Sequence, residues 1–171
     1  DPLYAEDNGF DLPQSFLRDD LSTKPEAHAA IVRLNDAFYG ALPRSDEASW
    51  RRFRNYYYNC VRDMDRRLGQ LLWALKQSGQ IDNTIIMFTS DHGERAGAHG
   101  MRQKAGTIYR EETNVPMIIV HPDARGDQST RGLMGAIDIA PTLMHFAGLS
   151  TDDIHQKFPG LPGINVGGLV T

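Results

Sequence analysis

Apolar residues recur every three or four positions along much of the first half of the chain. Through residues 50–75 this spacing predicts one long amphipathic helix, which Ser45 can cap and Gly79 can end. Residues 25–42 predict a shorter helix, stopped by Pro43. The long helix carries Trp50, Phe53, Tyr57, Val61, Met64, Leu68, Leu71 and Leu75 in one stripe, and the shorter one carries Ile31, Leu34, Phe38 and Leu42.

Two short apolar runs in the second half have the character of strands. Residues 84–89 and 115–120 are apolar at consecutive positions, which is typical of strands buried on both faces of a parallel sheet. We therefore expect an α/β fold in which part of a largely parallel sheet is flanked by helices. A further helix should run from Asp138 to Gly148, whereas residues 1–24 and 149–171 should hold little regular structure.

Composition narrows the class of protein without naming a function. The 171 residues suffice for one domain, 40% are hydrophobic and the net charge is -4. This charge gives no indication of a nucleic-acid or anionic-membrane partner. No apolar run approaches the roughly 20 residues that a membrane span requires. The single cysteine, Cys60, excludes a disulfide within the chain.

The residues with the clearest chemical potential follow the first predicted strand. Asp91 and His92 lie at its carboxyl end, where open α/β sheets bind ligands, and a carboxylate beside an imidazole is a plausible pair of metal ligands. Both side chains can reach one ion only if the chain turns, which Gly93 makes easy. Lys104 adds an ammonium group in the following loop. A cation and a lysine together would hold a tetrahedral oxyanion such as sulfate or phosphate.

Spacing alone leaves a structural interpretation open. An aspartate at a strand end often forms a turn or caps a helix, and a lone histidine is more often a structural residue than a ligand. The choice between these alternatives requires more of the sequence.

A wider set of motifs resembles the C-terminal signature of the sulfatase family, within the alkaline phosphatase superfamily. The resemblance covers roughly residues 45–149 and is weaker outside them. It rests on Thr89-Ser90-Asp91-His92-Gly93-Glu94, His99-Gly100, Lys104, Tyr109 to Pro116, Tyr57 to Gly69, Asp82-Asn83-Thr84 and Ile137 to Gly148. It implies that residues 1–171 are a single fragment, the C-terminal portion of a sulfatase-type hydrolase domain.

The resemblance also implies a role for individual residues. Asp91 and His92 match two ligands of the catalytic divalent cation, which is calcium in most sulfatases, with manganese or magnesium as other options. Lys104 matches the catalytic lysine that contacts the sulfate or phosphate group. His99 lies between them, either as a substrate-binding or supporting residue or as part of a structural turn. Glu94 has no role in the pattern and should be exposed.

The nucleophile expected of this family is missing from the sequence. Sulfatases carry it in a Cys/Ser-x-Pro/Ala-x-Arg motif whose cysteine is oxidised to formylglycine, and Cys60-Val61-Arg62-Asp63-Met64 does not fit. Paired acidic ligands from an early strand are missing too, since Asp19-Asp20 follows a polar loop. Calcium takes about 6 to 8 oxygen ligands. The chain alone should therefore bind metal weakly and hydrolyse no ester, and an open sheet edge could cause self-association.

These observations lead to one main hypothesis and two alternatives. The main hypothesis is a sulfuric ester hydrolase acting on a small-molecule or glycan sulfate ester through a formylglycine in a missing N-terminal half. The first alternative is a phosphonate monoester or phosphodiester hydrolase of the same superfamily, which this part of the sequence does not separate from a sulfatase. The second is a non-catalytic binding module.

Overall fold

The computed structural model describes residues 2–124 and 126–170. The chain forms two compact units. The first comprises the residues up to Ile81 together with His92–Pro116. The second comprises Asp82–Asp91 together with the residues from Met117 onward. Each is described separately below.

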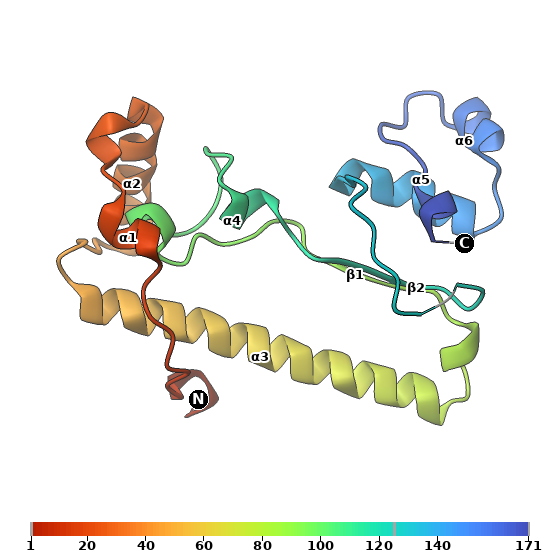
Figure 1. Ribbon diagram of the computed structural model, residues 1–171, viewed down its shortest axis with the longest axis horizontal. Helices are drawn as coiled ribbons and strands as arrows, with labels where there is room; N and C mark the ends of the chain where they lie inside the picture. Colours follow the sequence, from red (N-terminus) through yellow and green to blue (C-terminus); the bar gives the residue numbers. More distant parts are fainter. Residues whose placement is uncertain (1, 125, 171) are drawn as a thin grey trace. The chain divides into compact units, whose positions relative to one another are not determined.

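The first unit is dominated by helix α3 (Glu47–Gln77), 31 residues long (Figure 1). Its start is capped by Asp46, whose carboxylate accepts a hydrogen bond from the Ser49 amide at 3.1 Å. Gly79 follows the helix with a φ of 70°. The predicted long helix is thus confirmed, although Asp46 rather than Ser45 caps it.

The apolar stripe of α3 faces a core only near its start. Trp50 is buried, whereas the side chains of Val61, Met64 and Leu71 are exposed, at 48%, 62% and 58% of their surface. The apolar stripe is therefore only partly buried, because nothing in the described structure covers Val61, Met64 and Leu71.

The N-terminal segment is more regular than expected. It contains the 3-10 helices η1 (Pro2–Ala5) and η2 (Leu21–Thr23) and the short helix α1 (Gln14–Arg18). Phe16 of α1 is buried edge-on against Trp50, with ring centroids 5.3 Å apart. This aromatic contact orders a segment that polar composition alone predicted to be irregular.

Helix α2 (Glu26–Tyr39) ends before Gly40, three residues earlier than Pro43 suggested. Leu34 and Phe38 are exposed, and the buried residue of the helix is Asn35. The Asn35 amide donates to the Arg102 carbonyl at 2.9 Å. A polar contact with residues 92–116, called the motif loop below, therefore helps to position α2. Only part of its apolar face is covered, since Ile31 lies against Gly106.

In the second unit, strands β1 (Ile86–Thr89) and β2 (Met117–Val120) form a two-stranded sheet. The strands lie side by side (Figure 1) and pair antiparallel. Ile86 lies opposite Val120, and Thr89 lies opposite Met117. The expected parallel arrangement is thus not met in these two strands. A parallel pair needs a crossover connection, usually a helix, and the helices between these strands are only three and four residues long.

One face of this sheet is apolar and exposed. Phe88 and Ile118 are register partners and hence lie on the same face, and both are exposed, as is Val120. The expectation of strands buried on both faces is wrong for the described chain.

The second unit continues through the 3-10 helix η5 (Ala136–Asp138) and α5 (Ile139–Phe146), which ends near Gly148 as predicted. The tail, however, forms α6 (Thr151–Lys157) and the 3-10 helix η6 (Gly167–Leu169) (Figure 1). Ser150 and Asp153 form a reciprocal capping box, with Asp153 N donating to Ser150 Oγ at 3.0 Å. The prediction of an irregular tail missed this signal. Among the described residues, no helix has the length and apolar character needed to cross a membrane.

Candidate functional site

The segment from Asp91 to Pro116 contains every residue to which the sequence analysis assigned a candidate site role. It holds the 3-10 helix η4 (Ala98–Gly100) and the helix α4 (Arg110–Thr113). Its backbone is unusually constrained, because four non-glycine residues have left-handed φ angles: Ala96, His99, Gln103 and Ala105. Such conformations persist only where the surroundings enforce them, and they gather at functional sites.

Asp91 and His92 lie directly after β1, and both are exposed. His92 Nδ1 is 3.0 Å from the Gly93 carbonyl oxygen. Since a carbonyl oxygen only accepts, this contact requires a proton on Nδ1. A metal-binding imidazole that keeps its proton on Nδ1 binds the ion through Nε2.

Gly93 is fixed in place by close backbone packing. Its amide donates to the Glu112 carbonyl at 2.8 Å. A Cβ at this position would overlap the carbonyl of Glu111. Glycine is therefore required for a close approach between chain segments, a stronger reason than the easy turn inferred from the sequence.

Lys104 projects from the loop that follows η4, and its side chain is exposed. The backbone on either side is held by buried groups. Arg95 Nε donates to the Gln103 carbonyl at 2.8 Å, and the Ala105 amide donates to the Glu112 carboxylate at 3.0 Å. In the described parts of the chain, the Lys104 ammonium makes no hydrogen bond or ion pair. Its charge is therefore presented to solvent on a fixed backbone.

His99 occupies the centre of a compact polar cluster. Its Nδ1 lies 2.5 Å from Asp19 Oδ2 and its Nε2 lies 3.4 Å from Glu111 Oε2. The ring stacks on Tyr109, with centroids 3.7 Å apart and an angle of 11° between planes. The hydrogen bond with His99 lowers the pKa of Asp19, and burial raises the pKa of Tyr109. These contacts join the N-terminal segment to the motif loop.

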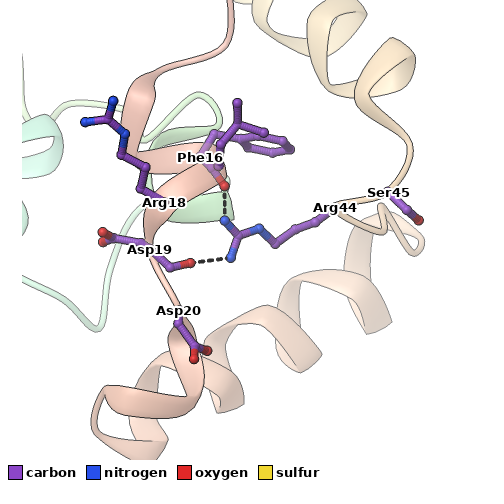
Figure 2. Close-up of a pocket in the computed structure, with 7 residues that line it drawn as sticks. Phe16, Arg18, Asp19, Asp20, Arg44 and Ser45 are labelled. Carbon is purple, nitrogen blue, oxygen red and sulfur yellow. Dashed lines mark hydrogen bonds between the residues drawn. The ribbon is translucent and has the colours of Figure 1, made fainter.

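Asp19 of this cluster also lines a pocket of about 440 Å³ (Figure 2). Arg44 reaches into it and donates to the backbone carbonyls of Asp19, at 2.6 Å, and of Phe16. A Cβ on Gly100 would collide with the Arg44 guanidinium. The Arg44 guanidinium therefore holds α1 in place through backbone carbonyls, and we assign it no role in binding a ligand.

The described residues supply only part of a donor set for a cation. Among residues 2–124 and 126–170, no three His, Cys, Asp or Glu side chains gather into an arrangement that could hold a metal ion. Asp91 and His92 have suitable chemistry, one carboxylate and one imidazole, but they supply only part of a coordination shell. The boundary between the two units falls between them, so His92, His99 and Lys104 belong to the first unit and Asp91 to the second.

A comparison with known protein families decides the family. The sequence profile described as Sulfatase matches residues 10–149, most of the chain. The chain belongs to the sulfatase family. The match begins well before residue 45, where the motif resemblance weakened, so the N-terminal segment that carries Asp19 is part of the family domain.

Individual sulfatases support this assignment. The chain is 36% identical over 97 residues to arylsulfatase K of Gallus gallus, covering 57% of this chain and 18% of that protein. It is 31% identical over 149 residues to the uncharacterized sulfatase YidJ of Escherichia coli (strain K12), covering 87% and 27%. The chain thus spans a fifth to a quarter or so of these relatives.

Solved structures extend the likeness to the fold. BT1596, a 2-O GAG sulfatase, matches with a TM-score of 0.76 at 24% identity, over 94% of this chain and 34% of that one. The phosphonate monoester hydrolase of Agrobacterium radiobacter matches with a TM-score of 0.63 at 28% identity, over 92% and 35%. BT4656, solved with its substrate D-glucosamine-2-N,6-O-disulfate, matches with a TM-score of 0.57 at 27% identity, over 81% and 29%.

Three residues of this region were missed from the sequence. Asp19 was given no role because it follows a polar loop, and no local pattern links it to His99. Arg95 and Glu112 are buried and paired at 3.2 Å, and no local pattern separates them from the exposed charged residues of the chain. Glu94 is half-buried rather than exposed, and its carboxylate accepts from the amides of Ala96 and Gln103.

Proposed function

We propose that this chain is part of a metal-dependent hydrolase of sulfuric esters, in which Asp91 and His92 hold a divalent cation and Lys104 binds the anionic group. The nucleophile, a formylglycine, and the remaining metal ligands belong to sequence outside this chain. The observation that carries the proposal is the exposed Lys104 ammonium on a backbone fixed by buried groups, within a loop that begins at His92.

The cation half of the proposal rests on the chemistry of Asp91 and His92. A carboxylate oxygen and a neutral imidazole nitrogen suit calcium, manganese or magnesium to different degrees. The contact between His92 Nδ1 and the Gly93 carbonyl orients the ring with Nε2 as the ligand atom. When bound, the cation would stabilise negative charge on the oxygens of the ester group.

The anion half rests on Lys104. An ammonium on a rigid backbone stabilises the charge of a sulfate group without reorganising during the reaction. Its position twelve residues after His92 in the family motif is consistent with both groups serving one site. His99 supports this loop through Asp19 and Glu111, and we propose it as a further residue on the substrate side.

The chain alone is then expected to be inactive and to bind metal weakly. It contains no recognisable nucleophile motif and only two of the proposed ligands. The apolar face of β1 and β2, which includes Phe88 and Ile118, is where further strands or helices of the complete domain would pack. In the isolated chain the same face would favour self-association.

For the substrate, we propose a sulfated sugar or another sulfate ester. Similarity to BT4656, whose structure contains a disulfated glucosamine, supports a glycan substrate. A phosphonate monoester is the alternative, and similarity to the hydrolase of Agrobacterium radiobacter supports it. Sulfate and phosphonate groups are both tetrahedral oxyanions, so Lys104 would serve either one.

Turnover by the complete hydrolase distinguishes these substrates. Aryl sulfate and aryl phosphonate esters of the same leaving group would be compared, with Lys104→Ala as the matched variant. A higher kcat/KM for the sulfate, lost in Lys104→Ala, is the expected result. A higher kcat/KM for the phosphonate would mean that the substrate is a phosphonate ester rather than a sulfate ester. No turnover of either ester would contradict the hydrolase proposal.

A further inference from the structure

Arg95 and Glu112 form a buried ion pair directly beneath the loop that carries Lys104. The Arg95 side chain is 0% exposed and the Glu112 side chain 5%, and Arg95 Nη1 lies 3.2 Å from Glu112 Oε1. Thr107 completes the group, since its hydroxyl accepts from Arg95 and donates to Glu112. Burial lowers the pKa of Arg95, while the charge of Glu112 acts in the opposite direction.

This pair binds the backbone on both sides of Lys104. Arg95 Nε donates to the Gln103 carbonyl at 2.8 Å, and Arg95 Nη2 donates to the Ala105 carbonyl at 3.4 Å. Glu112 Oε2 accepts from the Ala105 amide at 3.0 Å. The remaining amide, that of Gln103, donates to Glu94 at 2.6 Å. Every backbone polar group of the two residues adjoining Lys104 is therefore held by the side chain of Arg95, Glu112 or Glu94.

The loop needs such support because its conformation is unfavourable on its own. Gln103 and Ala105 both have positive φ angles, of 63° and 74°. Residues other than glycine adopt this region rarely, and they remain there only when the surrounding structure holds them. Without the buried pair, the two residues would relax toward ordinary φ values and Lys104 would move with them.

We propose that Arg95 and Glu112 are positioning residues for Lys104, which fix the point at which its ammonium meets the anionic group of the substrate. This inference rests on the role of Lys104 in the proposed function. It assigns the buried pair a part in anion binding beyond stability, because its bonds go to the two residues that flank the proposed anion-binding lysine.

The test uses the complete hydrolase, with inorganic sulfate as a competitive inhibitor of aryl sulfate turnover. Arg95→Lys keeps the charge opposite Glu112 but cannot reproduce the planar fork that reaches both carbonyls. Glu112→Gln keeps the size and shape of the side chain, and it is the second variant if Arg95→Lys does not fold. Arg102→Lys is the matched control, since Arg102 is also a buried arginine but donates to Gly40 and Asp36 instead.

We expect Arg95→Lys and Glu112→Gln to raise the inhibition constant for sulfate, and KM with it, by roughly 10- to 100-fold. Hydrogen exchange at the amides of residues 103–107 should become faster in the same variants. Arg102→Lys should leave the inhibition constant within about twofold of the wild-type value. A merely structural pair would lower the active fraction, and hence kcat, without changing the affinity of the folded enzyme for sulfate.

Two outcomes separate this inference from the proposed function. If Lys104→Ala weakens sulfate inhibition while Arg95→Lys and Glu112→Gln leave it unchanged, the positioning role is wrong and the proposed function stands. If Lys104→Ala itself leaves sulfate inhibition unchanged, Lys104 does not bind the anion. Both the positioning inference and the proposed function are then wrong.

Discussion

Asp19 and His99 are 80 residues apart in the sequence, yet Oδ2 of Asp19 lies 2.5 Å from Nδ1 of His99. The contact ties the segment that holds α1 to the motif loop of the same unit. The backbone amide of His99 also donates to the Ser15 hydroxyl at 3.2 Å. The N-terminal segment is thus bound to the proposed site through both the main chain and the side chain of His99.

This contact predicts a pH dependence of stability. The hydrogen bond with His99 lowers the pKa of Asp19 in the folded protein, and Lys24 and Arg44 add smaller effects in the same direction. The contribution is therefore present above the ordinary aspartate pKa of about 3.9 and is lost as pH falls through the lowered folded value.

Asp19→Asn should remove that dependence and lower the free energy of unfolding at neutral pH by about 1 kcal/mol, the upper range for a partly exposed pair. Urea unfolding between acidic and neutral pH measures both effects. Asp20→Asn is the neighbouring control, since within the described chain the hydrogen bonds of Asp20 go to Ser22 and Thr23 of the following 3-10 turn. Equal losses in the two variants would contradict a specific role for the Asp19–His99 contact.

The buried pair predicts a larger effect on stability. Glu112→Ala leaves the Arg95 guanidinium buried without its partner, which should cost about 3 to 5 kcal/mol of unfolding free energy. Arg33→Ala breaks the exposed pair with Glu26 and should change the free energy of unfolding by less than about 0.5 kcal/mol. Chemical denaturation of both variants checks the difference, and a similar small loss in each would argue against the buried pair as a support of the loop.

Close packing at Gly93 predicts a loss of activity from a single methyl group. The Cβ of Gly93→Ala would overlap the Glu111 carbonyl, so the segment following His92 must shift. A displacement of about 1 Å at a catalytic group can cost roughly 100-fold in rate, and a comparable fall in kcat/KM of the complete hydrolase is expected. Gly160→Ala, where a Cβ meets nothing within 4 Å, should have no effect. Wild-type activity of Gly93→Ala would contradict this account of the turn.

The exposed face of the small sheet predicts self-association of the chain on its own. Phe88 and Ile118 lie on one face and are exposed, and apolar strand faces of this kind promote association. Phe88→Asp with Ile118→Asp should shift the chain toward monomer in analytical ultracentrifugation. Leu133→Asp, at a single exposed apolar residue, is the control. An isolated wild-type chain that stays monomeric at high concentration would contradict the prediction.

Sequence reasoning located the long helix and both strands because those patterns are local. The period of α3 and the apolar runs of β1 and β2 arise from neighbouring residues. The direction in which the strands pair depends on the connection between them, and their burial depends on what covers them, so local patterns could not supply either. The largely parallel sheet expected of the complete domain stays a prediction for the sequence beyond this chain.

Some residues of the candidate site could likewise be predicted from local sequence, whereas others could not. Asp91, His92 and Lys104 were identified because they form a recognisable linear motif. Arg95 and Glu112 were not, because their importance comes from burial and from bonds to backbone groups 7 to 10 residues away in sequence. Asp19 depends on a contact between distant segments, which no local spacing reveals.

The central claim, that Asp91 and His92 hold a divalent cation, is tested most directly by calorimetric titration of calcium into the complete hydrolase. Asp91→Asn and His92→Ala would be measured beside the wild type, with Asp152→Asn as a surface control. We predict that each of the first two variants loses calcium affinity by about 10-fold or more, while the control does not. Unchanged calcium affinity in both Asp91→Asn and His92→Ala would contradict the account.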